Sequence, residues 1–139
     1  MPPSAFYDRN MPKEVPIGVR GEAHEKVDFK HTLTAHDKRL PPVYSTPDMI
    51  RLMEIAGFHA LQPFCEAGEI TVGTAINVEH RAACAVGAEV RATAELERVH
   101  GKFYVLRVAA HDGTREIGRG TITRAFIHLQ GFKDKQGIG

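Results

Sequence analysis

Alternation of apolar and polar residues predicts four consecutive strands in the second half of the chain. The clearest example is residues 88–99, where every second residue is apolar as far as Leu96 and the residues between are Glu, Arg or Thr. A period of two is typical of a strand with one buried face. The other three predicted strands cover residues 70–79, 103–110 and 117–129.

Turn signals separate these strands. Asp112-Gly113 is a strong hairpin signal and His100-Gly101 is a plausible two-residue turn. The four strands are therefore expected to form an antiparallel meander. Gly118 and Gly120 in the last strand indicate a bulge or a close backbone approach. A further strand is predicted earlier in the chain, over residues 26–34.

One segment has a helical character. Thr46-Pro47-Asp48 combines an N-cap hydroxyl, a proline in the first turn and an acid near the positive helix end. The helix is predicted to run from there to about Leu61, because Pro63 ends it. It is apolar on most sides, which is typical of a buried helix.

The order of elements predicts an α+β fold in which an antiparallel sheet wraps around one long central helix, the hotdog architecture. Such a sheet has exposed edge strands, which these folds pair into a continuous sheet in a dimer. Residues 1–24 are predicted to be an irregular N-terminal arm, residues 25–133 the hotdog domain and residues 134–139 a C-terminal tail.

Composition narrows the class of protein. A chain of 139 residues, with 42% hydrophobic and 25% charged residues, suits one soluble domain. The formal net charge of +1, with acids and bases interspersed, argues against binding nucleic acid. No apolar run is long enough to span a membrane. The two cysteines, Cys65 and Cys84, form no disulfide framework, so a reducing, cytoplasmic setting is expected.

Glu54 is the residue whose type fits its surroundings least. It lies in the middle of the apolar helix, where a carboxylate is costly unless something pairs with it. A catalytic acid would explain it. The alternative is a surface ion pair, since Asp48, Arg51 and Glu54 are spaced by three along the helix. The helical pattern alone leaves the two readings about equal.

Other candidate residues also have ordinary explanations. His80 follows a predicted strand and needs a partner group before it can act in proton transfer. Thr46 is explained by its place at the start of the helix. Gly73 lies inside a strand, where glycine often marks a close approach of a ligand or backbone. Cys84 is not supported as a nucleophile by any nearby base. The histidines show no metal-binding spacing, so no metal is expected.

Three sequence blocks resemble a known family. They are residues 71–80 (TVGTAINVEH), 109–113 (AAHDG) and 116–121 (EIGRGT). Together with the spacing of Thr46, Glu54 and His80, they closely resemble the fluoroacetyl-CoA thioesterase family of hotdog proteins. The resemblance covers roughly residues 25–133.

The resemblance implies a homodimeric enzyme that hydrolyses short acyl-CoA thioesters. Thr46, Glu54 and His80 are similar to its catalytic Thr, Glu and His. Gly73 is similar to its acyl-pocket glycine and Arg124 to an arginine of its last strand. The family's fluoroacetate-specific member has phenylalanines before the catalytic Thr, whereas here residues 37–44 read DKRLPPVY. The substrate-binding residues are expected to be Gly73, Arg124, Leu40, Tyr44 and Phe58.

The implied reaction uses CoA as part of the substrate and needs no metal or other cofactor. The phosphates of CoA are expected to contact basic side chains, and the candidates are Arg81, Lys102 and Arg124. Thr46 and Glu54 are eight residues apart, which is roughly 12 Å along a straight helix. If both belong to one helix, a shared site must combine them from different subunits of a dimer or tetramer.

Two other functions remain open at this stage. The first is a non-catalytic acyl-CoA-binding or regulatory hotdog domain. The second is a hotdog enoyl-CoA hydratase, which uses an Asp–His pair. A Glu on the helix and a His after the strand favour the thioesterase.

Overall fold

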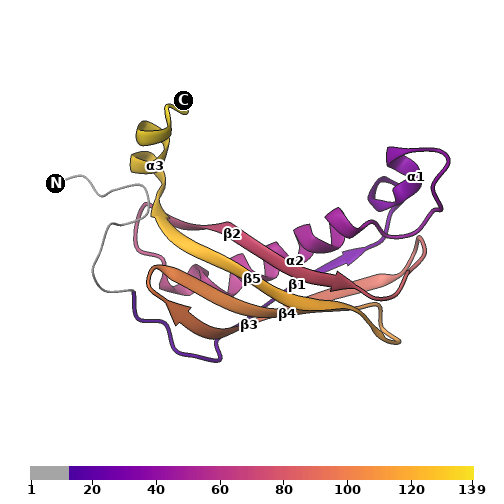
Figure 1. Cartoon of the computed structure of the whole chain (residues 1–139), viewed down its shortest axis with the longest axis horizontal. Helices are drawn as coiled ribbons and strands as arrows, with labels where there is room; N and C mark the ends of the chain where they lie inside the picture. The colour runs from indigo at the N-terminus through magenta and orange to yellow at the C-terminus, as the bar shows by residue number, and fades with distance from the viewer. Residues whose placement is uncertain (1–12) are drawn as a thin grey trace.

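Five antiparallel strands form one sheet that curls around a long helix in the structure, a computed structural model that describes residues 13–139 (Figure 1). The strands are β1 (Arg20–Lys26), β2 (Glu69–His80), β3 (Glu89–His100), β4 (Phe103–His111) and β5 (Glu116–His128), and the helix is α2 (Thr46–Leu61). Their order across the sheet is β1-β3-β4-β5-β2. The predicted α+β hotdog architecture is confirmed.

The core lies between α2 and the inner face of the sheet. The helix buries one broad apolar face, made of Met49, Leu52, Met53, Ala56, Gly57, Ala60 and Leu61. The strands supply small and branched side chains at alternating positions, among them Ala92, Ala94, Leu96, Leu106, Val108 and Ile122. The helix approaches β1 so closely that a Cβ at Gly21 would lie 2.3 Å from the Ala56 carbonyl oxygen. This packing fixes which residues of α2 face outward.

The start of α2 differs from the prediction by one residue. Ser45, not Thr46, is the N-cap: its side chain accepts a hydrogen bond of 3.1 Å from the Asp48 amide. Ser45 is fully buried, whereas Thr46 is the first helical residue and is exposed. Because Ser45 performs the capping, the Thr46 hydroxyl is available for another partner.

The strand predicted over residues 26–34 is wrong, because the first strand lies earlier, at β1 (Arg20–Lys26). Residues 20–24 of the predicted irregular arm are therefore strand, while residues 1–12 of that arm lie outside the described residues. The chain turns at Asp28, whose side chain caps the 3-10 helix η1 (Phe29–His31), and α1 (Leu33–His36) follows. The local hydrogen bonds of an Asp side chain override the apolar alternation here.

The predicted four-strand meander is right only for β3, β4 and β5. Strand β2 does not pair with β3, the next strand in the sequence. It pairs with β5 at the sheet edge, and residues 81–88 connect it to β3 without a tight turn. The β3–β4 turn is Gly101-Lys102, one residue later than predicted, and Asp112-Gly113 does begin the β4–β5 turn. The predicted tail is partly helical, because α3 (Leu129–Gln136) follows β5. A 3-10 helix, η2 (Gln62–Phe64), follows α2.

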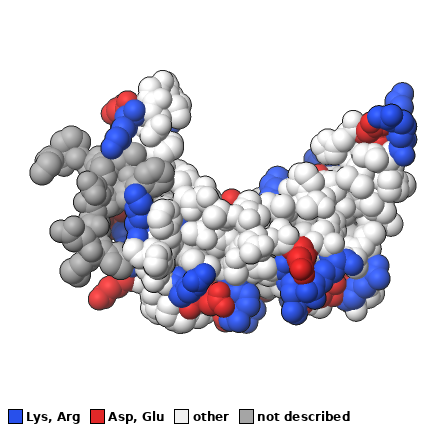
Figure 2. Space-filling model, in the orientation of Figure 1, with Lys and Arg blue, Asp and Glu red and all other residues white. Residues whose placement is uncertain are grey.

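The molecule has a hollow on one side. Helix α3 and the segment that carries α1 rise at opposite ends, and β2 runs along the border between them (Figure 1). Few charged side chains lie in this hollow, while the opposite border alternates basic and acidic groups (Figure 2). In the part described, no helix is long and apolar enough to cross a membrane.

Candidate active site

Thr46 and His80 are in direct contact although they are far apart in the sequence. The Thr46 Oγ1 lies 2.8 Å from the His80 Nδ1. Thr46 begins α2 and His80 ends β2, so the contact joins the helix to the edge strand. They share an open pocket of about 250 Å³, whose other lining residues are Leu33, Val43, Tyr44, Arg81, Ala82 and Ala83. We call it the Thr46–His80 pocket.

His80 is suited to proton transfer in its neutral form. Burial lowers the pKa of its imidazole below the usual 6.5, and the backbone of Ala82 acts in the opposite direction with smaller effect. The Nε2 atom is buried and has no hydrogen-bond partner among residues 13–139. A buried ring nitrogen without a partner is uncommon, so this atom is available for a group that the single chain does not supply.

Glu54 lies in a different pocket and pairs with Arg124. The Arg124 Nη1 is 3.2 Å from the Glu54 Oε1, and both side chains are mostly buried. Their open pocket of about 390 Å³ is also lined by Arg51, Ile55, Phe58, Thr71, Val72 and Gly73. We call it the Glu54 pocket. The surface alternative for Glu54 is wrong, because Arg51 pairs with Glu25 and Asp48 instead.

Arg124 is itself held rigidly. Its Nε donates to the Thr71 hydroxyl over 2.9 Å, and its Nη2 donates to the Thr71 carbonyl oxygen over 2.8 Å. Burial lowers the pKa of the guanidinium while the Glu54 carboxylate raises it, and an arginine stays charged at neutral pH. With all its nitrogens directed at Thr71 and Glu54, Arg124 orients the carboxylate rather than facing solvent.

Gly73 leaves room for the Glu54 carboxylate. A Cβ at this position would lie 2.1 Å from the Glu54 Oε2, so any side chain there would have to displace the carboxylate. A close approach to Gly73 is therefore present, but the approaching group is the Glu54 side chain and not a ligand or a backbone segment. The register between β2 and β5 also shifts between Gly73 and Ala75, so no β5 residue lies directly opposite Thr74, although its hydroxyl donates to the Thr123 carbonyl oxygen over 3.3 Å.

A substitution at Gly73 should disturb the site more than the fold. We expect Gly73→Ala to displace the Glu54 carboxylate and to lower kcat for the hydrolysis that the family resemblance implies by roughly tenfold or more. Its melting temperature should change little, because the strand is exposed there. Glu97→Ala, at an exposed position of β3 that lines neither pocket, is the control and should retain full activity. A Gly73→Ala enzyme as active as the parent would contradict this arrangement.

The two pockets are separate within one chain. Thr46 and Glu54 both belong to α2, so they lie roughly 12 Å apart along its axis. Glu54 packs on Gly73, which is seven residues, or about 23 Å, from His80 along β2. A single chain thus contains the parts of a site but does not bring Glu54 to the Thr46–His80 pair.

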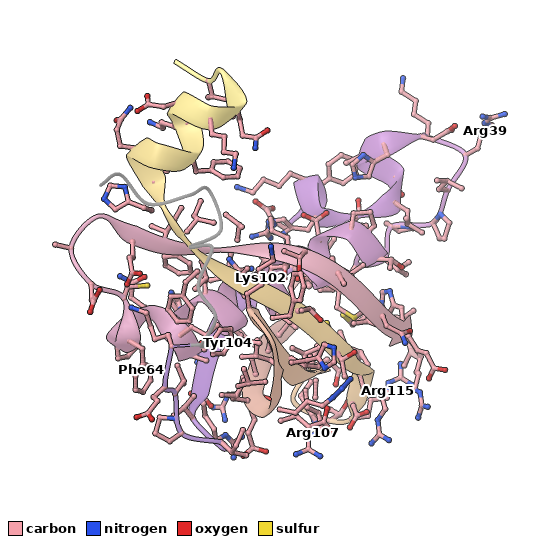
Figure 3. All side chains as sticks on the ribbon, turned by 60° about the vertical axis from the view of Figure 1, so that its left-hand side comes forward. Arg39, Phe64, Lys102, Tyr104, Arg107 and Arg115 are labelled. Atoms are coloured by element: carbon pink, nitrogen blue, oxygen red, sulfur yellow. The ribbon has the colours of Figure 1, made fainter. Side chains whose placement is uncertain are left out.

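The remaining predicted residues divide between the pockets. Tyr44 lines the Thr46–His80 pocket and Phe58 lines the Glu54 pocket. Leu40 lines neither of them and is 42% exposed in the loop after α1. The nearby Arg39, 88% exposed, extends from the tip of this loop and pairs with Asp37 (Figure 3).

The basic candidates for CoA lie at opposite ends of the sheet. Arg81 borders the Thr46–His80 pocket and pairs with Glu79 at 2.6 Å. Lys102, in the β3–β4 turn, stands over the Phe103 ring (Figure 3). Ala110, at the level of His80 across β5, is eight residues from Lys102, or about 26 Å along β4.

Two further predictions concern the cysteines and a metal site. Cys65 and Cys84 are free, and burial raises the pKa of both thiols, so Cys84 is a poor nucleophile. Within residues 13–139, no group of three or more His, Cys, Asp or Glu side chains is placed to hold a metal ion.

Sequence reasoning missed Thr71 and Glu25. Thr71 holds Arg124, and Glu25 contacts Tyr44 and Arg51. Thr71 reads as an ordinary polar position in an alternating strand, and Glu25 lay outside every periodic segment. Neither has a signal in the sequence, since their importance depends on which side chains the fold brings beside them.

Comparison with known proteins identifies the family. Residues 27–130 match the family model described as fluoroacetyl-CoA-specific thioesterase. The chain belongs to this family. The fluoroacetyl-CoA thioesterase of Streptantibioticus cattleyicolor is 44% identical over 112 residues, which are 81% of each chain. The predicted family is confirmed, and acyl-CoA thioesterase, the predicted enzyme class, is the class of this family.

Solved structures agree with this membership of the fluoroacetyl-CoA-specific thioesterase family. A variant of fluoroacetyl-CoA thioesterase in complex with acetyl-CoA is 39% identical and superposes with a TM-score of 0.83, over 88% of this chain and 97% of that chain. A thioesterase superfamily member from Thermus thermophilus is 27% identical, with a TM-score of 0.81 over 89% of this chain and 92% of that chain. The fold and the family are thus supported independently.

Proposed function

We propose that this protein hydrolyses a short-chain acyl-CoA to the free acid and CoA, at a site that combines Glu54 of one subunit with Thr46 and His80 of another in a homodimer. The contact between Thr46 and His80 carries the proposal, because it joins two of the three residues that resemble the family's catalytic set. The third, Glu54, is an oriented carboxylate in an open pocket. Among the described residues, the Thr46–His80 pocket has no carboxylate in its lining and the Glu54 pocket has no histidine.

A dimer supplies the missing contact. Strand β2 is an edge of the sheet, and Ile76 in its middle is 47% exposed. An unpaired edge with an exposed apolar side chain is suited to pairing with a second copy. Such a pairing would fill the hollow that carries few charges (Figure 2). It would place the Glu54 pocket of one copy near the Thr46–His80 pocket of the other.

Glu54 acts on the thioester carbonyl by one of two routes. In the first, a carboxylate oxygen adds to the carbonyl carbon, the C–S bond breaks, and water then hydrolyses the acyl-glutamate anhydride. In the second, Glu54 takes a proton from a water whose oxygen adds to the carbonyl carbon before the C–S bond breaks. Both routes require a carboxylate held in place, and the Arg124 Nη1 lies 3.2 Å from the Glu54 Oε1.

His80 moves the proton that balances the reaction. The departing CoA thiolate needs one proton, and hydrolysis releases one from the attacking water. In the first route His80, neutral because burial lowers its pKa, takes the proton of the water that cleaves the anhydride and passes it to the thiolate. In the second route it passes to the sulfur the proton that Glu54 has taken from the water. Thr46 fixes the orientation of the ring through Nδ1. No metal or redox cofactor is needed for these steps.

The backbone near Gly73 is the proposed oxyanion site. The bulge between Gly73 and Ala75 leaves no β5 residue directly opposite Thr74 in the strand register. A hydrogen-bond donor directed at the developing oxyanion lowers the barrier by about 3 kcal/mol. The glycine leaves this backbone open to the substrate as well as to Glu54.

The pH dependence of the reaction should reflect His80. Since burial lowers its pKa below 6.5, His80 stays neutral at pH 7 and loses its role only when it is protonated at lower pH. We therefore expect the limb of the kcat/KM profile that reports His80 to fall on the acid side of pH 6.5. A profile of kcat/KM between pH 5 and 9 measures it. A His80-dependent limb centred above pH 6.5 would contradict this.

Release of free thiol from a panel of acyl-CoAs tests the function. The panel should contain acetyl-, fluoroacetyl-, propionyl- and butyryl-CoA, with crotonyl-CoA followed for hydration. Hydrolysis of at least one saturated acyl-CoA supports the proposal. Binding without turnover would indicate the non-catalytic domain, and hydration of crotonyl-CoA alone would indicate the hydratase.

We further propose a cytoplasmic setting, which the two free cysteines support.

A further inference from the structure

The carboxylate of Glu25 joins three elements between the two pockets. Its Oε2 accepts a hydrogen bond of 2.5 Å from the Tyr44 hydroxyl, and its Oε1 accepts one from the Arg51 Nη2. The His31 Nε2 lies 3.5 Å from the same Oε1. Glu25 comes from β1, its side chain is only 11% exposed, and it belongs to neither pocket.

Two of these partners are pocket walls. Tyr44 lines the Thr46–His80 pocket and Arg51 lines the Glu54 pocket. One carboxylate therefore holds a wall residue of each pocket. Arg51 is 44% exposed along its side chain, so it depends on Glu25 and Asp48 for a fixed position.

The link to the reacting groups runs through the backbone after η1. Tyr44 is two residues before Thr46, and its amide donates to the Cys84 carbonyl oxygen over 2.8 Å. The Ser45 amide donates to the His31 carbonyl oxygen over 2.9 Å. The side chains of Tyr44 and His31 thus position the backbone from which Thr46 extends to His80.

The chemistry of the cluster makes it stiff. A carboxylate that is almost buried is stable only when its oxygens are paired, and hydrogen bonds to a charged acceptor are stronger than neutral ones. Burial and the nearby Glu25 hold the pKa of the Tyr44 phenol far above its usual range, so the hydroxyl remains a donor. The Asp28 amide donates to the His31 Nδ1 over 3.0 Å, which leaves Nε2 to donate toward Glu25.

We propose that Glu25 is a positioning residue for the hydrolysis: by fixing Tyr44 and Arg51 it sets the placement of the Thr46–His80 pair relative to the Glu54 pocket. The inference rests on the proposed function. Glu25 itself touches no reacting atom. A purely structural ion cluster would stabilise the fold and leave turnover per folded molecule unchanged, so the two roles can be distinguished.

A buried acid at the other end of the molecule provides the control. Glu69 has a fully buried side chain paired with Lys13, and its Oε1 accepts from the Glu66 amide. It begins β2, eleven residues and about 36 Å from His80 along the strand. Glu69→Ala should therefore lower the melting temperature without changing kcat.

The test compares Glu25→Ala, Glu25→Gln and Glu69→Ala in the full chain. With the most active acyl-CoA of the panel, Glu25→Ala should lower kcat about tenfold and change KM less than about threefold. Glu25→Gln should lie between it and the parent, because the amide oxygen still accepts from Tyr44 but no longer pairs with Arg51. Tyr44→Phe, which keeps the ring and removes the hydroxyl, should reproduce part of the loss if Glu25→Ala does not fold.

A second measurement does not depend on turnover. The imidazole pKa of His80, followed by NMR, should rise toward 6.5 in Glu25→Ala because a loosened Tyr44 admits water to the pocket. It should not change in Glu69→Ala. If the Glu25 variants match Glu69→Ala in both kcat and the His80 titration, the inference is overturned. If the parent hydrolyses no acyl-CoA, the proposed function fails, and the His80 titration alone then decides the role of Glu25.

Discussion

Replacing Glu54 with alanine is expected to lower kcat for acyl-CoA hydrolysis by about 100-fold or more. Among residues 13–139, Glu54 is the one carboxylate that lines its pocket, and both proposed routes begin with it. Truncation also leaves Arg124 without its acid partner, but the two hydrogen bonds to Thr71 keep the guanidinium in place. Thiol release under saturating acyl-CoA measures the effect.

Two comparisons separate chemistry from structure in this experiment. Glu54→Gln keeps the shape of the side chain and removes its charge, so it should be nearly as inactive as Glu54→Ala. Glu66→Ala, an exposed acid, should behave like the parent. A Glu54→Ala enzyme that hydrolyses acyl-CoA as fast as the parent would refute the mechanism proposed for this site.

Mixing two inactive variants should restore activity. In a dimer of Glu54→Ala with His80→Ala, one site receives the intact Glu54 of one chain and the intact Thr46 and His80 of the other. The second site of the same dimer receives both substitutions. If half of the dimers are mixed after exchange, about a quarter of the parental activity should return. The increase in activity over either variant alone is large, because each variant alone is nearly inactive.

The mixing experiment requires exchange of subunits, by joint refolding or by co-expression with two tags. Activity of the purified mixed dimer is then compared with that of each variant alone. Recovery would place Glu54 and His80 in one site across the subunit interface. No recovery in a verified mixed dimer would mean that each chain builds its own site, against the roughly 12 Å and 23 Å separations within the chain.

Local patterns predicted most of the regular structure correctly. The helix over 46–61 and the strands after it follow from apolar periodicity, Pro47 and the turn residues, which act over a few positions. The errors occurred where side-chain hydrogen bonds decided between similar local options. Asp28 caps a 3-10 helix where the apolar pattern predicted a strand. Ser45 is the N-cap of α2, a position that was predicted for Thr46.

The site was only partly accessible from the sequence. Thr46, Glu54, His80 and Gly73 were named through a family resemblance, and the unusual setting of Glu54 drew attention to it independently. Their contacts were not predictable: the pairing of Glu54 with Arg124 joins residues 70 positions apart, and no periodic signal connects them. The same is true of Glu25 and its partners.

The sequence by itself determined the long helix, the four strands that follow it and the family. Those properties depend on residue type and short spacing, which a chain carries before it folds. The tertiary structure decided which acidic and basic side chains are in contact. Strand β2 lies beside β5, Arg124 turns Glu54 against Gly73, and α2 holds Thr46 and Glu54 too far apart to meet. Helix spacing had already suggested a site shared between subunits, but only the folded chain shows that Glu54 and the Thr46–His80 pair line separate pockets.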